Sequence, residues 1–517
     1  LEGLTLTLEY TPDDYSAERR DDPTRRAPPP FIAGAVWRPF PERFKGVEIA
    51  AATAGGKELM LRATLRLEPD MLKFERPGPP PSIPKPRTRA GKDLEAALPA
   101  GPFRDAMPLF GEGREDAPVG ADPGLAGPSN GATLWLNPAF PPKTPLGRDM
   151  GRAFRHMAAT IAPDAEWLTV AALPDGLSGP AVTIPRDALL RAADGRGSAE
   201  VLWRAAEIAP AWGAGVPPAG AWAWRGLSAR LRIGLEESLF EHGASGVMRA
   251  YGDVETAWTP HPGVILGATV RKNGRNTLAW LNNWLWIAEK PVRSDLPLYV
   301  LDTAAERLHL SLRRSLGADW HVGVDAGWLE EMYAGFGGEI LHQPFGARWA
   351  AGGSLYRGWK RRPWDYFRVD YANDATQALA AAHYEGEGGA WSASLEAGRY
   401  LGGDWGGGAY FTRRLPGEAS LSAHAVWTNG PLAQHAQLGG KGEYGLRLSV
   451  PLGGLGAAAL RYLTGADSYA LPLRIDAAVR TLGRDAGQKL DRPAPIYDRL
   501  SAAGYGRLTG SWGRLLE

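Results

Sequence analysis

The residues that could carry catalytic or metal chemistry are scattered along this chain. Nine histidines occur without an HExxH motif or any short ligand spacing, so no metal site is predicted. The absence of cysteine excludes thiolate metal sites and thiol nucleophiles, and no G-x-S-x-G string presents a serine nucleophile. A dinucleotide-like string from Gly454 to Ala459 lacks a surrounding βαβ unit and is read as a strand turn. We therefore predict no catalytic residue, metal or cofactor.

Two pairs of charged residues near the centre are candidates for acting on a sugar or binding one. Glu330 and Glu331 are adjacent, and on a strand adjacent side chains point to opposite faces. They cannot then form the carboxylate pair of a glycosidase, and a structural turn position is favoured. Arg399 and Asp404 fall at a strand end and its turn, where a salt bridge that fixes the turn is favoured over a sugar-contacting pair.

The elements that position these residues alternate with period two. From Trp320 to Trp328 apolar and polar or small residues alternate, and the pattern returns around residues 367–371, 391–397 and 419–427. Each run spans roughly nine to eleven residues between Gly, Pro, Asn or Asp, which is the length of a tilted strand that crosses a bilayer. No segment has eighteen or more uncharged apolar residues, as a membrane helix requires. These patterns predict a mainly β protein built on a large antiparallel transmembrane β-barrel.

The polar face of the predicted strands carries charges of both signs. A water-filled lumen accommodates such rows, whereas a small apolar core does not. The residues that we expect to line the lumen are Arg62, Arg66, Arg307, Arg313, Asp325, Arg368, Asp370, Glu396 and Arg447.

Composition is compatible with this interpretation. The net charge of +1 gives no support for a nucleic-acid partner, which would need a concentrated basic face. The lack of cysteine fits an oxidising compartment. Twenty Trp and 16 Tyr suit the interfacial belts of a membrane barrel. Trp359, Trp364 and Tyr366 could belong to such a belt or stack on sugar rings, and the belt is favoured.

Four regions follow from the distribution of patterns. Residues 1–70 hold the first barrel strands, and the alternating opening at Leu4–Tyr10 indicates that a leader has been removed or that the chain starts within a longer one. Residues 71–147 are a Pro- and Gly-rich linker or loop. Residues 148–210 show helical spacing and form a small inserted α/β domain, which we expect in the periplasm. Residues 211–517 supply the main barrel strands and a C-terminal tail, for a total of about eighteen to twenty strands.

Several uncommon strings also occur in a characteristic order. They lie at residues 3–10, 329–350, 398–406 and 484–493. The chain resembles the YjbH-like outer-membrane exopolysaccharide biosynthesis proteins in these strings. The positions that carry the resemblance include Glu330, Glu331, Gly337, Gly338, Glu339, Pro344, Phe345, Gly346, Gly398, Arg399, Tyr400, Asp404, Arg484, Asp485 and Gly487.

The resemblance implies a barrel in the outer membrane of a Gram-negative bacterium. Its expected partners are outer-membrane lipids, an extracellular polysaccharide and periplasmic polysaccharide-export proteins. Three functions are open: a secretion or assembly component that passes or guides the polymer, a membrane-embedded enzyme that modifies it, and a structural anchor of the secretion apparatus. Distributed lumenal charges favour the first, because a hydrolase needs a convergent constellation of acid, base or nucleophile.

Overall fold

A computed structural model shows how these segments fold. It describes residues 4–10, 31–37, 47–54, 58–65, 131–138, 140, 142, 144–160, 165–214, 227–238, 246–278, 290–363, 365–430, 442–452 and 473–517. The chain divides into two compact units, Leu1–Phe74 and Glu75–Glu517. The fold class predicted from the alternation is confirmed, because the protein is mainly β and contains a closed barrel.

The first unit is an antiparallel sheet of four strands in sequence order. These are β1 (Leu4–Tyr10), β2 (Phe31–Trp37), β3 (Val47–Ala54) and β4 (Glu58–Leu65). They pair only with each other among the described strands, so they do not extend the barrel as predicted. The same alternating pattern occurs in the strands of this separate sheet and in those of the barrel. Because the sequence cannot distinguish the two, its prediction of eighteen to twenty barrel strands is too high.

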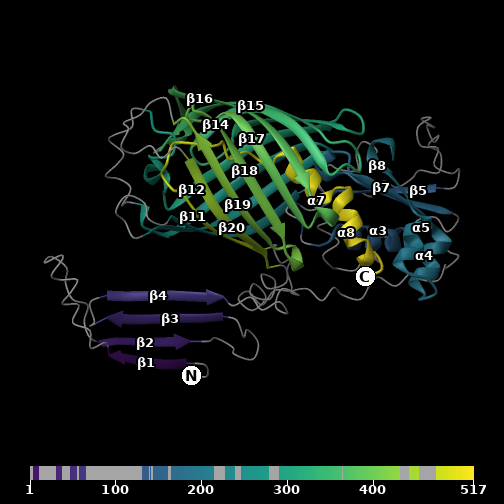
Figure 1. The fold of residues 1–517 in the computed structure, drawn as a ribbon, viewed down its shortest axis with the longest axis horizontal. Helices are drawn as coiled ribbons and strands as arrows, with labels where there is room; N and C mark the ends of the chain where they lie inside the picture. Colours follow the sequence, from purple (N-terminus) through teal and green to yellow (C-terminus); the bar gives the residue numbers. More distant parts are fainter. Residues whose placement is uncertain are drawn as a thin grey trace. The chain divides into compact units, whose positions relative to one another are not determined.

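Thirteen of the described strands, β9 to β21, form the closed barrel (Figure 1). Successive strands pair antiparallel, and β21 closes the sheet by pairing parallel to β9. The strands are β9 (Leu227–Ser238), β10 (Val247–His261), β11 (Val264–Asn276), β12 (Thr303–Ser315), β13 (Trp320–Trp328), β14 (Tyr333–His342), β15 (Trp349–Arg362), β16 (Asp365–Glu385), β17 (Trp391–Arg399), β18 (Trp405–Arg414), β19 (Ser420–Thr428), β20 (Gly442–Pro451) and β21 (Leu473–Arg480).

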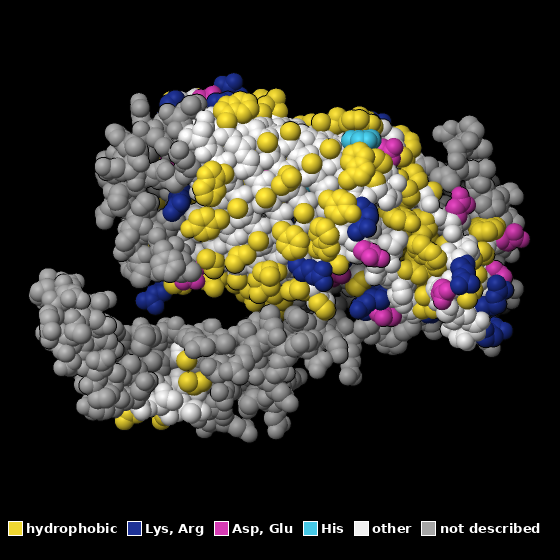
Figure 2. All heavy atoms as spheres, in the orientation of Figure 1, with side chains coloured by type: hydrophobic (Ala, Val, Ile, Leu, Met, Phe, Trp, Pro, Cys, Tyr) yellow, Lys and Arg dark blue, Asp and Glu magenta, His cyan; other side chains and the backbone are white. Residues whose placement is uncertain are grey.

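The two faces of the barrel wall differ in chemistry. Along β12, Leu308, Leu310 and Leu312 are exposed on the outside, while Ser311 and Arg313, which alternate with them, are buried on the inside. Figure 2 shows that hydrophobic side chains dominate the drawn face of the wall and that charged side chains are few there. A closed sheet with an apolar outer face and a polar inner face inverts the pattern of a water-soluble protein.

Aromatic side chains gather near both ends of the strands. One group contains Trp320, His342, Trp349, Tyr384, Trp391 and Phe411, whose rings contact one another in the pairs 320–342, 342–349, 384–391 and 391–411. At the opposite ends of the strands, Trp359 packs between Phe336 and Tyr371. These positions fit two belts around the barrel. None of the described helices is long and apolar enough to cross a membrane.

An α/β domain, residues 131–214 of the second unit, precedes the barrel. Its sheet has the order β5 (Gly131–Leu136), β6 (Trp167–Ala172), β7 (Pro180–Pro185) and β8 (Glu207–Pro210), with β5 parallel to β6. Its helices are α3 (Leu146–Thr160), α4 (Arg186–Ala193) and α5 (Ala199–Ala205). Short 3-10 turns are η1 (Pro174–Gly176) and η2 (Ala211–Ala214).

Helix α3 has the apolar spacing of a helix that covers a sheet. Leu146, Met150, Phe154 and Met157 recur on one face and are buried against the strands. Helical spacing predicts α3 and α4, and apolar runs predict β6 and β7, close to where the structure has them. The sequence also predicts a helix over Ala199–Ala209, but α5 ends at Ala205 and β8 follows it, and β5 falls within the segment predicted as a loop. The alternation also predicts strands at Thr277–Ile287 and Ala457–Leu463. Only Thr277 and Leu278 of the first are described, and the second lies outside the described residues.

Two further helices follow the barrel and complete this domain. They are α7 (Ile496–Ala503) and α8 (Tyr505–Ser511), followed by the 3-10 turn η7 (Trp512–Arg514). Leu508, Trp512 and Leu515 are buried in the same hydrophobic cluster as Phe154 and Leu168. The C-terminus is therefore part of the α/β core, and Figure 1 shows α8 beside α3.

We expect the stability of this domain to depend on pH through Asp149, at the start of α3. Burial raises the pKa of Asp149 to about 6, although Thr144 donates a hydrogen bond to its carboxylate at 2.5 Å. The folded state therefore holds the proton more tightly than the unfolded state, and stability falls as pH rises from about 4 to about 6. The cost above pH 6 is roughly 3 kcal/mol at most.

Hydrogen exchange along α3 in the intact protein, corrected for intrinsic rates, measures this effect. Protection should be greater at pH 4.5, near the lower end of the titration range, than at pH 7, above its upper end. In Asp149→Asn, whose side chain does not titrate, protection should be equal at the two pH values. An unchanged pH dependence in this variant would refute the assignment.

Candidate functional site

The barrel interior is crossed by the chain itself. After β21 ends at Arg480, residues 481–495, which we call the lumenal segment, run through the barrel without helix or strand. The segment starts at the end that holds the turns 329–332 and 400–404, which we call the distal end. It emerges as α7 at the opposite end, where η1 packs on β11 and β12, which we call the domain end.

Asp485 fixes the start of the lumenal segment at the distal end. Its Oδ1 accepts hydrogen bonds from the backbone N–H groups of Val292, Arg293 and Ser294 at 3.0, 2.6 and 2.8 Å. Its Oδ2 accepts the hydroxyl of Ser294 at 3.0 Å. One carboxylate thus satisfies three consecutive backbone donors in the connection between β11 and β12.

Four side chains of the barrel accept hydrogen bonds from backbone N–H groups farther along the tail. The pairs, acceptor first, are Asp404 with Gly487 at 2.8 Å, Gln377 with Leu490 at 2.8 Å, Glu330 with Asp491 at 2.8 Å, and Glu339 with Ile496 at 2.9 Å. An irregular segment has no ladder partners, so side chains of the wall meet the need of its buried backbone donors.

Ion pairs add to these contacts. They join Lys489 to Glu396 at 2.8 Å, Arg492 to Glu339 at 2.6 Å, and Asp491 to Arg307 at 3.2 Å. At the domain end the ring of Tyr497 stacks on His383 with centroids 3.8 Å apart. The lumenal segment is therefore anchored to the wall along its whole length.

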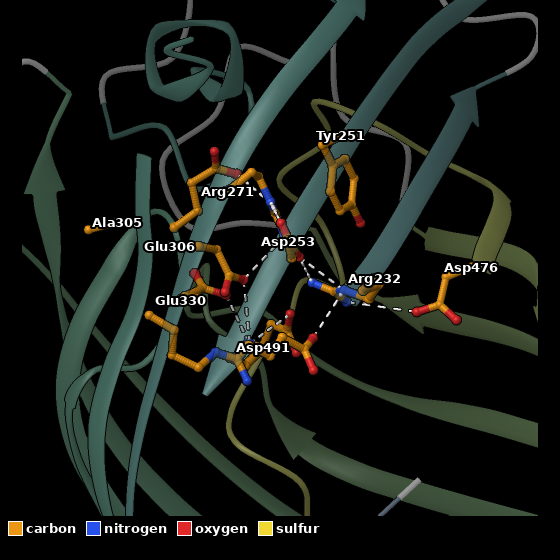
Figure 3. Close-up of polar contacts among 12 residues, drawn as sticks. Arg232, Tyr251, Asp253, Arg271, Ala305, Glu306, Glu330, Asp476 and Asp491 are labelled. Carbon is orange, nitrogen blue, oxygen red and sulfur yellow. Dashed lines mark hydrogen bonds and ion pairs between the residues drawn. The ribbon is translucent and has the colours of Figure 1, made fainter. Parts of the chain in front are cut away.

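A second cluster of charges lies on the wall formed by β9 to β12. Arg271 donates to Asp253 at 2.8 Å and pairs with Glu331 at 3.2 Å, and Arg249 contacts the same Glu331 at 2.6 Å. The guanidinium of Arg271 lies over the ring of Tyr251, 3.9 Å from its centroid. Figure 3 shows Asp253 between Arg232 and Arg271, with Tyr251 beside them.

The pKa values of the adjacent glutamates in the turn 329–332 are shifted in opposite directions. Burial raises the pKa of Glu330, although Arg293 binds both its oxygens at 2.7 Å. Burial also disfavours the charge on Glu331, but Arg249 and Arg271 outweigh it and lower the pKa. Both carboxylates are engaged by arginine, so the turn position with a structural role explains them better than acid and base chemistry.

A cavity of about 1040 Å³ remains beside the lumenal segment. On the β9–β12 side it is lined by the charged cluster. On the β16–β19 side it is lined mainly by hydroxyl and imidazole groups, namely Ser392, Ser394, Thr412, Ser422, His383 and His424. The cavity thus offers both charged and uncharged hydrogen-bonding groups to a hydrated ligand.

The residues predicted to line the lumen fall into three groups. Arg307, Glu396 and Arg447 line the cavity, and Arg313 and Asp325 form a buried pair at 2.8 Å that faces the carbonyl of Pro493. Arg368 is exposed and pairs with Asp365, and Asp370 accepts from the backbone of Ala372; neither lines the cavity. The side chain of Arg62 and the whole of Arg66 lie outside the described residues.

The positions that carry the family resemblance converge on the lumenal segment. Glu330 and Asp404 accept its backbone donors, Glu339 pairs with its Arg492, and Asp485 and Gly487 belong to it. No ion pair joins Arg399 to Asp404 among the described residues; Asp404 binds Gly487 instead. Trp359 lies in the distal aromatic group, whereas Trp364 and the side chain of Tyr366 are outside the described residues.

Several residues of the site were not predicted from the sequence. Gln377, Arg249 and Arg271 had no motif, and Lys489 and Arg492 were noticed only within the resembling strings. Their partners are distant in sequence, so only the barrel topology brings them together. In the described part of the chain, no group of three or more His, Asp or Glu residues could hold a metal ion.

A substitution at Gly487 tests how firmly the barrel wall binds the lumenal segment. Its φ is +70°, and a Cβ there would lie 2.9 Å from Cγ1 of Val426. Gly487→Ala should destabilise the protein by about 1–3 kcal/mol through backbone strain and a weakened bond to the buried Asp404. Urea denaturation in detergent measures the loss, with Gly252→Ala, whose Cβ would have open space, as control. Equal midpoints for the two variants would contradict the prediction.

The fold and the site define a class of protein: a closed β-barrel with a polar interior and an internal segment that its own wall holds. The family model described as "Exopolysaccharide biosynthesis protein YbjH" matches residues 1–502, so the chain belongs to this family. The "Uncharacterized lipoprotein YjbH" of Escherichia coli (strain K12) is 28% identical over 224 residues. That match covers 41% of this chain and 29% of the relative, so it spans less than a third of the relative's length.

Proposed function

We propose that the protein is an outer-membrane β-barrel component of exopolysaccharide secretion or assembly, whose polar lumen guides the polymer. The observation that carries the proposal is the closed barrel with an apolar, aromatic-banded outside and a charged, hydroxyl-lined inside. Such a surface suits a bilayer, and such an interior suits a polymer rich in hydroxyl groups. Membership of the exopolysaccharide biosynthesis family supports the polysaccharide as cargo.

The arrangement of the connections supports an orientation. Apart from residues 452–472, the connections at the domain end are short, whereas 277–302 and 429–441 at the distal end are long. Barrels usually place short turns in the periplasm and long loops outside. The α/β domain would then face periplasmic polysaccharide-export proteins as partners.

Membrane embedding is tested by a pair of neighbouring substitutions on β17. Leu395 is 65% exposed on the outer face, whereas Ser394 lines the cavity. Leu395→Arg should weaken folding into lipid vesicles by about 2–4 kcal/mol, because a guanidinium would enter hydrocarbon. Ser394→Arg should leave the protein folding into vesicles, since its side chain enters the hydrated lumen. Equal behaviour of the two variants would contradict a lipid-facing wall.

The role in secretion is tested in cells. Deletion of the gene from the producing bacterium should reduce polymer on the cell surface and retain it inside the outer membrane, and the full-length gene should restore export. Polymer is measured in the surface, periplasmic and medium fractions. Unchanged amount and distribution of surface polymer after deletion would refute the proposed function.

A further inference from the structure

The lumenal segment obstructs the path that a guided polymer would take. It crosses from the distal end, where Asp485 is bound, to the domain end, where Tyr497 stacks on His383. The cavity of about 1040 Å³ lies beside it and is lined in part by residues 488–499. In this conformation the segment and the polymer would compete for the same lumen.

The way in which the segment is held differs from the way in which the wall is built. Wall strands share backbone ladders, but the segment has no strand pairing. Its backbone donors at Gly487, Leu490 and Asp491 bind side chains of the wall. Side chains can exchange such bonds for water by rotamer changes, and the barrel ladder stays intact.

The segment is also tethered at both ends. It continues from β21 on one side, and on the other it leads through α7 and α8 into the core of the α/β domain, where Leu508 and Trp512 are buried. Side-chain contacts also join that domain to the barrel: Ser178 N–H donates to Ser315 Oγ at 2.8 Å, and Ser501 Oγ donates to Glu385 at 3.1 Å. A shift of the domain relative to the barrel would therefore pull on the segment.

We infer that residues 481–495 are a displaceable plug that closes the lumen, held at one end by the α/β domain. The inference concerns regulation of the lumen and rests on the proposed function only for the identity of the cargo. Displacement exposes the acceptors Asp404, Gln377, Glu330 and Glu339, which a hydroxyl-rich polymer can then use in place of the backbone donors.

Conductance of the full-length protein in planar bilayers tests the plug, with KCl as the permeant salt. Because this chain has no cysteine, Gln377→Cys/Leu490→Cys introduces the only thiols of the chain, at two residues joined by a 2.8 Å hydrogen bond. A short bis-methanethiosulfonate linker should then hold the segment on the wall and abolish openings, and a reductant should restore them. The single-cysteine proteins treated in the same way serve as controls.

A second variant works in the opposite direction. Glu339→Ala/Asp404→Ala removes the acceptors for Ile496 and Gly487 together with the partner of Arg492, and should raise the open fraction roughly ten- to a hundredfold. Heat-modifiable migration on gels shows that it is folded. The inference is overturned if the linked protein conducts like the reduced one, or if the release variant is folded and silent.

The two proposals fail separately. If the linked pore reopens on reduction but deletion of the gene leaves surface polymer unchanged, the plug is supported and the polysaccharide is refuted as the cargo. Conductance indifferent to the linker, in a protein whose deletion blocks export, refutes the plug and leaves the proposed function standing.

Discussion

Glu331→Ala is expected to lower the free energy of unfolding by about 3–5 kcal/mol. The carboxylate is buried and contacts Arg249 at 2.6 Å and Arg271 at 3.2 Å. Without it, Arg249 loses its one carboxylate partner among the described residues, and Arg271 keeps Asp253 and Glu306 as carboxylate partners there. Urea denaturation of the protein in detergent measures the loss.

The matched control is Glu200→Ala. Glu200 also pairs with an arginine, Arg204 at 2.6 Å, but the two side chains are 72% and 76% exposed. Exposed pairs of this kind contribute little, so the change should stay below about 0.5 kcal/mol. A loss at Glu331 no larger than that at Glu200 would show that the cluster does not hold the wall together.

Trp512→Ala should destabilise the α/β domain by about 3–5 kcal/mol. The indole is buried in the domain core, its Nε1–H donates to the carbonyl of Ala199 at 2.6 Å, and its ring meets Trp203 edge-on with centroids 4.8 Å apart. Truncation would therefore leave a cavity and an unpaired acceptor. Thermal denaturation, together with proteolysis of the C-terminal helices, measures the effect.

Trp212→Ala is the control for this substitution, because Trp212 belongs to the same domain and is 50% exposed. We expect a shift in the midpoint too small to resolve. Cleavage of α8 that is no faster in Trp512→Ala than in this control would contradict a C-terminus anchored in the domain core.

The barrel could be predicted from sequence because its signal is local. Alternation such as that of Trp320–Trp328 depends only on which face of a strand contacts an apolar environment, and each strand repeats it. The partition of strands between sheets is not local. Leu4–Tyr10 alternates in the same way as the barrel strands and yet belongs to a separate sheet.

The candidate site could not be predicted for a related reason. The contact of Glu339 with Arg492 joins residues 153 positions apart, and that of Gln377 with Leu490 joins residues 113 apart. No pattern within the lumenal segment marks it as internal, since a loop and a buried irregular segment have the same composition. The resembling strings indicated that these positions belong together but did not indicate that they meet.

The parallel pairing of β21 with β9 has a consequence for chain topology. The thirteen strands of the barrel are joined by an even number of antiparallel steps, so the first and last strands run in the same direction. The chain therefore enters the barrel at one rim and finishes at the other. Helix α8 and the turn η7 belong to the α/β core at the rim of entry, and the tail must return through the ring to reach it. With one strand fewer or more, no return would be needed. During folding, the sheet therefore has to close around its own tail or be threaded by it afterwards.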